Sequence, residues 1–322
     1  MNSVLIGFGA SLPKKRILNT ELSPDLNTSD EWITRRTGIK QRYIASESET
    51  TSSLAVEAAK NALKHAKISA DDIDLVVVAT VTGDYTFPAT ATIVQRELGI
   101  KHGAAFDISA ACSGFVYALD IVDSYIKTGK FKCALIIGAE TFSRIVDWKD
   151  RSTCVLFGDG AGAVVVQAQE TSLGVQYCKI RSAGEFIDSL KTSGGISTTQ
   201  TSGVTMMEGR EVFRFAIEKM NEALQQLLLD NNLSVEDIDL LVPHQANSRI
   251  IDKIIEESGI TKEKVVVTLN KHANTSAASI PLALNEVKDE LFKKKNVVLL
   301  SMGAGFTWGA ALIKFSNNIS GR

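Results

Sequence analysis

The chain has 322 residues, of which 44% are hydrophobic and 22% are charged, and its formal net charge is −2. This balance is typical of a soluble globular protein with a large core, and it excludes the basic field that favours nucleic-acid binding. No apolar run reaches the roughly 18 residues that a membrane span needs, and the N-terminus lacks the basic region of a signal peptide.

The first half of the chain alternates helical and strand patterns. Apolar residues recur at helical spacing in some segments, and short apolar runs typical of buried strands occupy the segments between them. In chain order we expect a helix at 53–67, a strand within 68–80, a helix at 90–100, a strand at 103–109, a helix from 113 and a strand at 133–140.

The second half repeats this order. The sequence Asp-Ile-Asp-Leu occurs at 72–75 and again at 237–240, after a predicted helix in both places. In the second copy we expect a helix at 211–232, a strand within 233–245, a helix at 247–260, a strand at 264–270, a turn at 272–277 and a strand at 296–305. Alternation of this kind argues for parallel strands covered by helices, and the fold class we predict is α/β with two duplicated mixed-sheet halves. We infer a duplication, with halves at 1–170 and 171–322 that pack as one five-layer body around a pseudo-twofold axis.

The four cysteines stand at 112, 133, 154 and 178, without the spacing of a zinc site or a redox pair, so we expect no metal. Cys133 and Cys154 lie in or beside runs interpreted as buried strands, and Cys178 lies in a β-like stretch. We therefore expect these three to be structural. Free thiols fit a reducing cytoplasm.

Cys112 differs because it stands at the start of a predicted helix. Phe115, Val116, Leu119, Val122 and Ile126 form one apolar face behind it, with Gly129 as the helix stop. The N–H groups and dipole at a helix start favour an anion, so we expect them to lower the pKa of this thiol. The alternative is a small buried filler, the commonest role of a free cysteine.

Two residues of the second half occupy matching positions at strand ends. His244 ends the strand within 233–245, and Asn274 follows the strand at 264–270. Ligands bind outside the carboxyl ends of parallel strands, so Cys112, His244 and Asn274 can converge. Alone, His244 is consistent with a core histidine and Asn274 with a turn or helix cap. His65, His102 and His272 are weaker candidates.

Cys, His and Asn support two chemistries. Papain-like proteases use these three residues, but their cysteine lies near the mature N-terminus, and a duplicated α/β pattern does not suit them. The other chemistry is acyl transfer to the thiol, followed by carbon–carbon bond formation, in which His and Asn donate hydrogen bonds to an enolate oxygen. A binding protein without activity would have lost one of the three residues.

Eight segments carry a resemblance to a known family. They are "TSDEWITRRTGI" (28–39), "FPATA" (87–91), "DISAACSGF" (107–115), "DRSTCVLFGDGAGAVVV" (150–166), "GREVFRFA" (209–216), "VPHQANSRI" (242–250), "NTSAASIPLAL" (274–284) and "GAGFTWGAAL" (303–312). Through them the chain resembles β-ketoacyl-acyl-carrier-protein synthase III, the initiating condensing enzyme of bacterial type II fatty-acid synthesis, from residue 3 to 315.

The resemblance implies a thiolase-like five-layer αβαβα fold and a homodimer. It implies that an acyl-CoA, with acetyl-CoA expected, acylates Cys112. Malonyl-acyl carrier protein then loses CO2, and the enolate, held by His244 and Asn274, attacks the acyl group. Acetoacetyl-acyl carrier protein results, and the acyl-CoA is a substrate, so no cofactor is expected. An oxyanion hole is implied at the N–H of Cys112 and around Ala304.

The resemblance also assigns binding residues. The CoA or substrate-lining positions are Thr28, Trp32, Arg36, Arg151, Gly209, Phe213, Ala246, Asn247 and Ile250. Phe142 matches an acyl-pocket position, and Phe87 matches the residue that reaches into the partner's pocket. Two bulky rings predict a short primer.

Carrier-protein docking is assigned to Arg249, with Arg214 and Lys253 adding positive charge. Glu256 and Glu257 stand where some relatives carry lysine, so we expect a smaller or displaced patch. These charges are also consistent with an ordinary solvated helix face. The polar stretch 189–209 is either a flap over the CoA tunnel or a surface loop.

A relative in secondary metabolism remains an alternative, with other acyl thioesters as substrates. Relatives that make hydroxymethylglutaryl-CoA use an acidic residue as base, and none is evident beside Cys112 in the sequence.

Overall fold

A computed structural model describes residues 1–22 and 24–316. Its first sheet has the order β1-β7-β6-β4-β5. These strands are β1 (Asn2–Ser11), β4 (Leu75–Ala79), β5 (Ala104–Ile108), β6 (Cys133–Glu140) and β7 (Gly160–Gln169). β4 runs parallel to β5 and β6, while β7 runs antiparallel to β6 and β1. Every residue of β4 and β6 is buried, which explains their unbroken apolar runs.

The second sheet has the order β11-β12-β13-β8. Its strands are β8 (Gly174–Ser182), β11 (Leu240–Pro243), β12 (Asn296–Gly303) and β13 (Thr307–Lys314). β11 and β12 are parallel, and β13 is antiparallel to both β12 and β8. This is the pattern of β4, β6, β7 and β1 in the first sheet, so the predicted duplication is present. The predicted boundary after residue 170 lies between β7 and β8.

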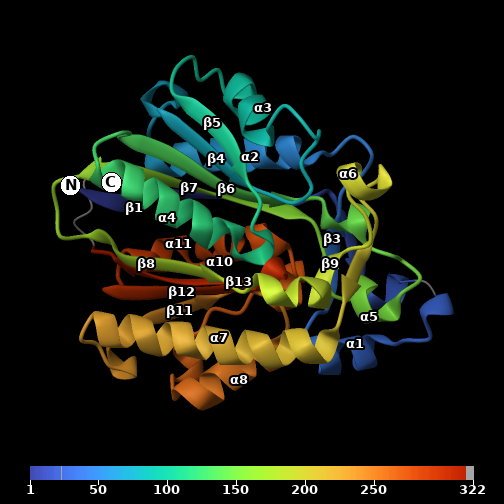
Figure 1. The fold of residues 1–322 in the computed structure, drawn as a ribbon. Coiled ribbons are helices and arrows are strands. Elements are labelled where there is room, and N and C mark those ends of the chain that lie inside the picture. Colours follow the sequence, from blue (N-terminus) through green and yellow to red (C-terminus); the bar gives the residue numbers. More distant parts are fainter. Residues whose placement is uncertain (23, 317–322) are drawn as a thin grey trace.

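Helices separate and cover the two sheets (Figure 1). The helices α2 (Thr51–Ala66) and α3 (Thr90–Glu97) cover the outer face of the first sheet, and α7 (Gly209–Asp230) with α8 (Ser248–Ser258) covers that of the second. Between the sheets lie α4 (Gly114–Lys127) and α10 (Ser279–Glu286). The predicted five-layer αβαβα arrangement is thus confirmed.

Local sequence signals explain where these helices end. Gly99, Gly129 and Gly259 adopt φ values of +74°, +73° and +75° just beyond α3, α4 and α8, a conformation that favours glycine. The predicted face of α4 is completely buried between the sheets. No helix in the described residues is both long and apolar enough to cross a bilayer.

Smaller elements surround this frame. They are β2 (Lys15–Leu18), α1 (Asp30–Thr37), β3 (Gln41–Ile44), α5 (Arg151–Cys154), β9 (Leu190–Thr192), α6 (Ile196–Thr199), β10 (Thr205–Met207), α9 (Leu269–His272) and α11 (Lys288–Leu291), and the short 3-10 turns η4 (Ala111–Ser113) and η9 (Ser276–Ala278).

The strand predicted at 264–270 is wrong. Only one bridge, between Leu241 and Val265, remains of it, and α9 begins at Leu269. The buried Gln245 side chain explains the difference. Its carbonyl oxygen accepts from the N–H groups of Thr268 and Leu269, and its amide donates to the carbonyl of Val266. One carboxamide thus provides the hydrogen bonds that a neighbouring strand would otherwise supply.

Cys154 is also placed differently from the prediction. It ends the short helix α5 instead of lying in or beside a strand, although it is buried as expected. Asp150 starts this helix, because its carboxylate accepts from the N–H of Ser152. Cys133 and Cys178 do lie in strands, β6 and β8.

Candidate active site

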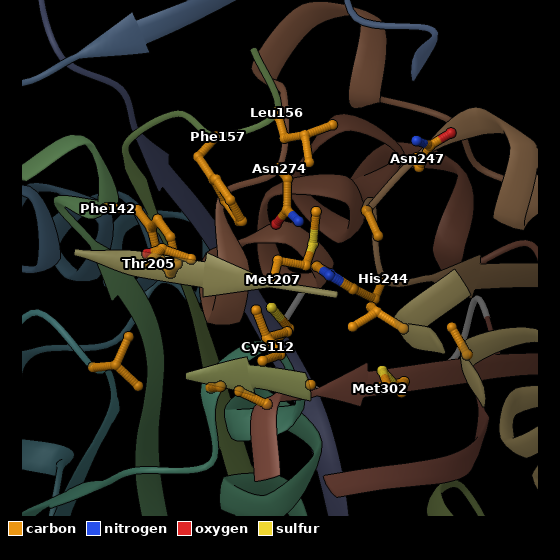
Figure 2. Close-up of a pocket in the computed structure, with 18 of the residues that line it drawn as sticks. Cys112, Phe142, Leu156, Phe157, Thr205, Met207, His244, Asn247, Asn274 and Met302 are labelled. Atoms are coloured by element: carbon orange, nitrogen blue, oxygen red, sulfur yellow. The ribbon is translucent and has the colours of Figure 1, made fainter. Parts of the chain in front are cut away.

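Cys112, His244 and Asn274 line one cavity of about 400 Å³. Cys112 lies in η4 between β5 and α4, His244 follows β11, and Asn274 lies between α9 and η9. Figure 2 shows the three side chains directed toward a common space. Each is nearly buried, with 4% to 7% of its surface exposed. The expected convergence of the three residues is therefore present, although Asn274 follows the short helix α9 and not a strand.

Unusual backbone conformations shape the turns around the thiol. Ala111, Ser276 and Phe306 have φ values of +45°, +50° and +43°, which cost a residue with a side chain about 1–3 kcal/mol each. Gly303 lies so close behind η4 that a Cβ atom there would stand 2.7 Å from the backbone nitrogen of Cys112. The surrounding packing therefore fixes the position of Cys112.

The expected lowering of the Cys112 pKa is wrong. Burial, together with the nearby carboxylate of Glu140, raises the pKa of the thiol to about 12. The hydroxyl of Ser276 and the backbone N–H of Cys112 itself act in the opposite direction but do not outweigh burial. The thiol of Cys112 is therefore protonated near neutral pH.

His244 is held neutral. Burial lowers the pKa of its imidazole to about 3. Its Nδ1 lies 2.6 Å from the hydroxyl oxygen of Ser279, which also accepts from the backbone N–H of Gln245 at 3.4 Å. In the tautomer in which the Ser279 hydroxyl donates to Nδ1, the imidazole proton resides on Nε2. His244 can therefore donate a hydrogen bond without carrying charge.

Asn274 is oriented by its own turn. Its side-chain oxygen accepts from the N–H of Ser276 at 2.9 Å, and its backbone pairs with Leu156 and Gly158. With the oxygen engaged, the amide group of the side chain remains as the donor toward the cavity. Asn274 and His244 thus offer two neutral donors, the arrangement that stabilises a developing oxyanion.

Aromatic rings form one wall of the cavity. Phe142 stacks on Phe157 with ring centroids 4.2 Å apart, and both rings are buried. Thr205 adds its side chain from β10, anchored by a hydrogen bond to the carbonyl of Ile145 at 2.9 Å. The sequence identified Phe142 but not Phe157 or Thr205, because apolar and small polar residues in such runs carry no signal of their own.

Most predicted substrate-lining residues are part of this cavity. Those of the second half that line it are Gly209, Phe213, Ala246, Asn247, Ile250 and Ala304. Cavity-lining residues that the sequence did not single out are Val81, Ser109, Ala111, Ile145, Leu156, Leu190, Lys191, Thr192, Met207, Val212, Ala216, Met220, Met302 and Gly303.

Trp32, Arg36 and Arg151 do not line the cavity but form a cluster of their own. The guanidinium carbons of Arg36 and Arg151 lie 5.5 and 4.9 Å from the centroid of the Trp32 ring. Trp32 belongs to α1, which contacts α8 next to the cavity residues Ala246 and Asn247. Nearby in sequence, Thr28 has a buried hydroxyl without a hydrogen-bond partner.

Phe87 lies outside the cavity of its own chain and is 84% exposed. It is accompanied by Tyr85, which is 66% exposed, and it precedes Pro88 across a cis peptide bond. Two large exposed rings close together are unusual for an isolated subunit.

The three predicted docking residues differ in their partners. Lys253 pairs with Glu256 at 2.6 Å, and Arg214 pairs with Glu218 at 3.4 Å. Arg249 forms no ion pair with the described residues and lies over the ring of Phe213, with its guanidinium carbon 5.3 Å from the centroid. The acid Glu257 accepts from Asn221 on α7.

The stretch 189–209 is not a featureless loop. β9 and β10 pair as an antiparallel ribbon, and Leu190, Thr192 and Met207 from this ribbon line the cavity. The ribbon therefore forms part of the cavity wall, as expected for a segment that covers a binding tunnel.

Comparison with known proteins places the chain in one family. Models described as 3-oxoacyl-[acyl-carrier-protein (ACP)] synthase III and its C-terminal part match residues 106–184 and 228–315. A β-ketoacyl-[acyl-carrier-protein] synthase III of Rhizobium meliloti (strain 1021) is 53% identical, covering 98% of this chain and all of the relative.

Solved structures agree with this assignment. The 3-oxoacyl-[acyl-carrier-protein] synthase III of Aquifex aeolicus VF5 has a TM-score of 0.92 and 47% identity, covering 97% of this chain and 100% of that one. The priming β-ketosynthase of the R1128 polyketide pathway has a TM-score of 0.91 but only 32% identity, covering 98% and 96%. The sequence motifs, the cavity and these full-length similarities together show that the chain belongs to the β-ketoacyl-acyl-carrier-protein synthase III family.

Proposed function

We propose that this enzyme transfers a short acyl group, acetyl above all, from acyl-CoA to Cys112 and condenses it with malonyl-acyl carrier protein. The products are acetoacetyl-acyl carrier protein, CO2 and CoA, and the reaction starts fatty-acid elongation. The observation that carries the proposal is the convergence of Cys112, neutral His244 and the Asn274 amide in one buried cavity.

In the first half-reaction, the sulfur of Cys112 attacks the thioester carbonyl of the acyl-CoA. The negative charge that develops on the carbonyl oxygen is held by the N–H of Cys112 and by an N–H of the turn around Ala304. Ala304 lines the cavity, and Gly303 packs directly behind the nitrogen of Cys112. CoA leaves, and the acyl group remains on the thiol.

In the second half-reaction, the malonyl group enters the same cavity and loses CO2. The Nε2–H of His244 and the amide of Asn274 stabilise the enolate oxygen that forms. The enolate carbon then attacks the acyl carbonyl, and the bond to Cys112 breaks. Decarboxylation generates the carbanion, so His244 acts as a donor and no base is needed to remove a proton from carbon. The cycle requires no cofactor beyond its acyl-CoA substrate.

The Trp32 cluster fits the far end of CoA. An indole ring offers a stacking surface for adenine, and the guanidinium groups of Arg36 and Arg151 suit phosphate oxygens. The cavity residues Gly209, Phe213, Ala246, Asn247 and Ile250, together with Thr28, would follow the pantetheine arm toward Cys112.

The acyl pocket and the exposed Phe87 point to a homodimer with a short primer. β5 is an edge strand of the first sheet, and the exposed Phe87 and Tyr85 belong to the segment that connects β4 to α3. A second copy that covers this surface would bury both rings, and Phe87 would close the partner's pocket opposite Phe142. Together these rings leave room for an acetyl group but oppose a branched chain.

Arg249 is the strongest candidate for contact with the acidic carrier protein, because its charge is not neutralised by a neighbouring acid, whereas Lys253 and Arg214 are paired. The docking patch is therefore small. The four free cysteines fit the reducing cytoplasm in which such a carrier protein acts.

Mass spectrometry of the intact enzyme tests the function directly. After exposure to acetyl-, propionyl-, isobutyryl- and hexanoyl-CoA, we expect a mass increase of one acyl group, largest for acetyl and located on Cys112 after proteolysis. Malonyl-acyl carrier protein should then discharge the acyl group and give the β-ketoacyl product. Preferential labelling by a longer or branched acyl group would instead favour a priming role in secondary metabolism.

A further inference from the structure

A fully buried arginine lies between the elements that carry the Trp32 cluster. Arg42 belongs to β3, and none of its surface is exposed. In the described residues no aspartate or glutamate forms an ion pair with it, and its Nε has no hydrogen-bond partner. Burial lowers the pKa of its guanidinium only to about 10, so Arg42 is charged at neutral pH. A buried cation without a counter-ion costs free energy, so its place in the core calls for an explanation.

One arm of the guanidinium binds the end of α5. Its Nη1 donates to the carbonyl of Val155 at 2.5 Å and to that of Cys154 at 3.5 Å. These carbonyls stand at the C-terminus of α5, where no further helical turn supplies N–H donors. The helix is one turn long and begins at Arg151. The contact that holds its last carbonyls therefore also limits where Arg151 can lie.

The other arm of the guanidinium reaches α1 through Asn19. Its Nη2 donates to the side-chain oxygen of Asn19, which is itself buried. The amide nitrogen of Asn19 donates to the carboxylate of Asp30 and to the carbonyl of Ile39, at 2.8 Å in both cases. Asp30 begins α1 and Ile39 follows its end, so Asn19 holds both ends of that helix. Because a guanidinium only donates, the Asn19 oxygen must face Arg42 and its amide must face α1.

Arg42 therefore joins the two helices whose side chains form the Trp32 cluster. Trp32 and Arg36 belong to α1, and Arg151 belongs to α5. Arg151 also donates to the carbonyl of Asn27 at 2.6 Å, but that contact is exposed, whereas the hydrogen bonds of Arg42 are buried. Hydrogen bonds from a charged donor are stronger where water is excluded. The buried link through Arg42 thus sets the spacing between the indole ring and the two exposed guanidinium groups.

We propose that Arg42 is a positioning residue for the nucleotide end of acyl-CoA. The proposal rests on the proposed function, in which the adenine and the phosphates of CoA bind the Trp32 cluster. Arg42 is completely buried and touches no substrate. It holds α5 against α1 before CoA binds, so that binding has less ordering to impose on these two helices. Its effect therefore lies in the affinity for CoA and not in the chemical step at Cys112.

A neighbouring contact decides which half-reaction to measure. The chain continues from Val155 to Leu156, whose carbonyl accepts from the backbone N–H of Asn274 at 2.9 Å. A substitution at Arg42 can therefore also disturb Asn274, which in the proposed mechanism acts only in condensation. Acylation of Cys112 does not use Asn274, so it isolates the effect of Arg42 on CoA binding.

The test compares acetyl-CoA with acetyl-pantetheine, which has the same acyl group and pantetheine arm but no adenosine and no phosphate. Single-turnover acylation of Cys112, followed by acid quench and intact mass over a range of donor concentrations, gives the half-saturating concentration and the maximal rate. For Arg42→Gln we expect the half-saturating concentration of acetyl-CoA to rise about tenfold, with the maximal rate changed by less than about twofold. The acylation rate constant for acetyl-pantetheine should be unchanged.

Three further variants support this test. Asn19→Ala cuts the link to α1 and should show the same selective loss for acetyl-CoA. Arg42→Lys keeps the charge but replaces the fork by one nitrogen, so it should show the loss as well. Arg16→Gln is the matched control, because Arg16 is exposed on β2, opposite Tyr43 of β3, and both donors should be unaffected. If Arg42→Gln does not fold, as judged by circular dichroism, Asn19→Ala and Arg42→Lys decide the question.

A purely structural role of Arg42 predicts another pattern, namely an equal loss of acylation by both donors. That result would overturn the proposal, and so would an unchanged half-saturating concentration of acetyl-CoA in the variants. The wild type separates this proposal from the proposed function. If acetyl-pantetheine acylated the wild-type enzyme as efficiently as acetyl-CoA, the placement of the CoA nucleotide at the Trp32 cluster would itself be wrong.

Discussion

The two halves of the molecule build the same turn and use it differently. In the first half, Ala111 has a φ of +45° and begins η4, which leads into α4. In the second half, Ser276 has a φ of +50° and begins η9, which leads into α10. The residue after it is Cys112, the proposed nucleophile, in one turn and Ala277 in the other. The duplicated backbone is retained, while the chemistry is divided between the copies.

In each half, the end of one strand packs against a turn of the other half. The end of β12, at Gly303, packs against η4, whereas the end of β6, at Glu140, packs against η9. Matching strand ends thus hold Gly303, which the backbone of Cys112 approaches closely, and the buried Glu140, beside η9. Each turn is supported by the other half, so neither half alone contains a complete site.

The largest expected effect is the loss of activity when Cys112 is replaced, compared with replacement of a cysteine outside the cavity. Cys112→Ala should reduce formation of acetoacetyl-acyl carrier protein by about a thousandfold or more, because no acyl-enzyme can form. Cys133→Ala, at the buried start of β6, is the matched control and should keep the activity with a stability loss of about 1 kcal/mol. Equal product formation by Cys112→Ala and the wild type would remove the thiol from the mechanism.

Substitutions in the second half should spare the first half-reaction. His244→Ala and Asn274→Ala should each reduce condensation by about a hundredfold or more, since each removes one enolate donor, while acylation by acetyl-CoA persists. Stopped-flow acylation and steady-state condensation measure the two steps separately. An equal loss in both steps would contradict the division of labour between the halves.

The next prediction concerns the pH dependence that His244 gives to condensation. His244 becomes protonated only near pH 3, so condensation by a preformed acyl-enzyme should not decline between pH 8 and 5 through this group. The folded-state pKa lies below the unfolded value of 6.5, so the neutral imidazole contributes stability that is present above pH 6.5 and is lost as the pH falls toward 3. A condensation rate that halves near pH 6.5 would show that His244 titrates normally.

A smaller effect distinguishes the surface helices α8 and α3, which are counterparts in the two halves. Arg249→Glu should raise the KM for malonyl-acyl carrier protein about tenfold, with little change for acetyl-CoA. Arg96→Glu on α3 reverses a charge that is already paired with Glu97 at 2.6 Å and serves as the control. If Arg249→Glu raised the KM for both substrates equally, Arg249 would not be a docking residue.

The smallest effect concerns the acyl pocket. Phe142→Leu replaces one of two stacked rings with a smaller side chain. The kcat/KM for isobutyryl-CoA, relative to that for acetyl-CoA, should rise a few-fold, since accommodating the extra methyl group contributes about 1 kcal/mol. Phe131→Leu, at a ring that packs on Tyr125 away from the cavity, is a comparable control. An unchanged ratio would place the primer elsewhere in the cavity.

Local patterns in the sequence predicted much of the fold. Helical spacing, glycine stops and apolar runs located α2, α3, α4, α7 and α8 and most strands, because these signals depend on neighbouring residues. The prediction of a strand at 264–270 was wrong because the side chain of Gln245, some twenty residues earlier, binds the backbone N–H groups that a neighbouring strand would otherwise bind. No local pattern encodes such a replacement.

Prediction of the site from the sequence was limited in the same way. Cys112 and His244 were recognisable from their positions at strand ends, and these two together with Asn274 from family motifs, although the strand predicted before Asn274 is a short helix, α9. The packing of the end of β6 against η9 of the other half was not predictable, because it arises only in the complete fold. Nor did the helix start predict the thiol pKa, since burial depends on the complete fold.

The position of Trp32 between two guanidinium groups has a practical consequence in spectroscopy. The chain contains three tryptophans, and Trp32 is the one flanked by Arg36 and Arg151. Adenine stacking on this ring would quench its emission, whereas Trp148 and Trp308, on other elements, would contribute a constant background. Intrinsic fluorescence excited at about 295 nm should therefore report CoA binding without a label, even in a Cys112→Ala enzyme that forms no product.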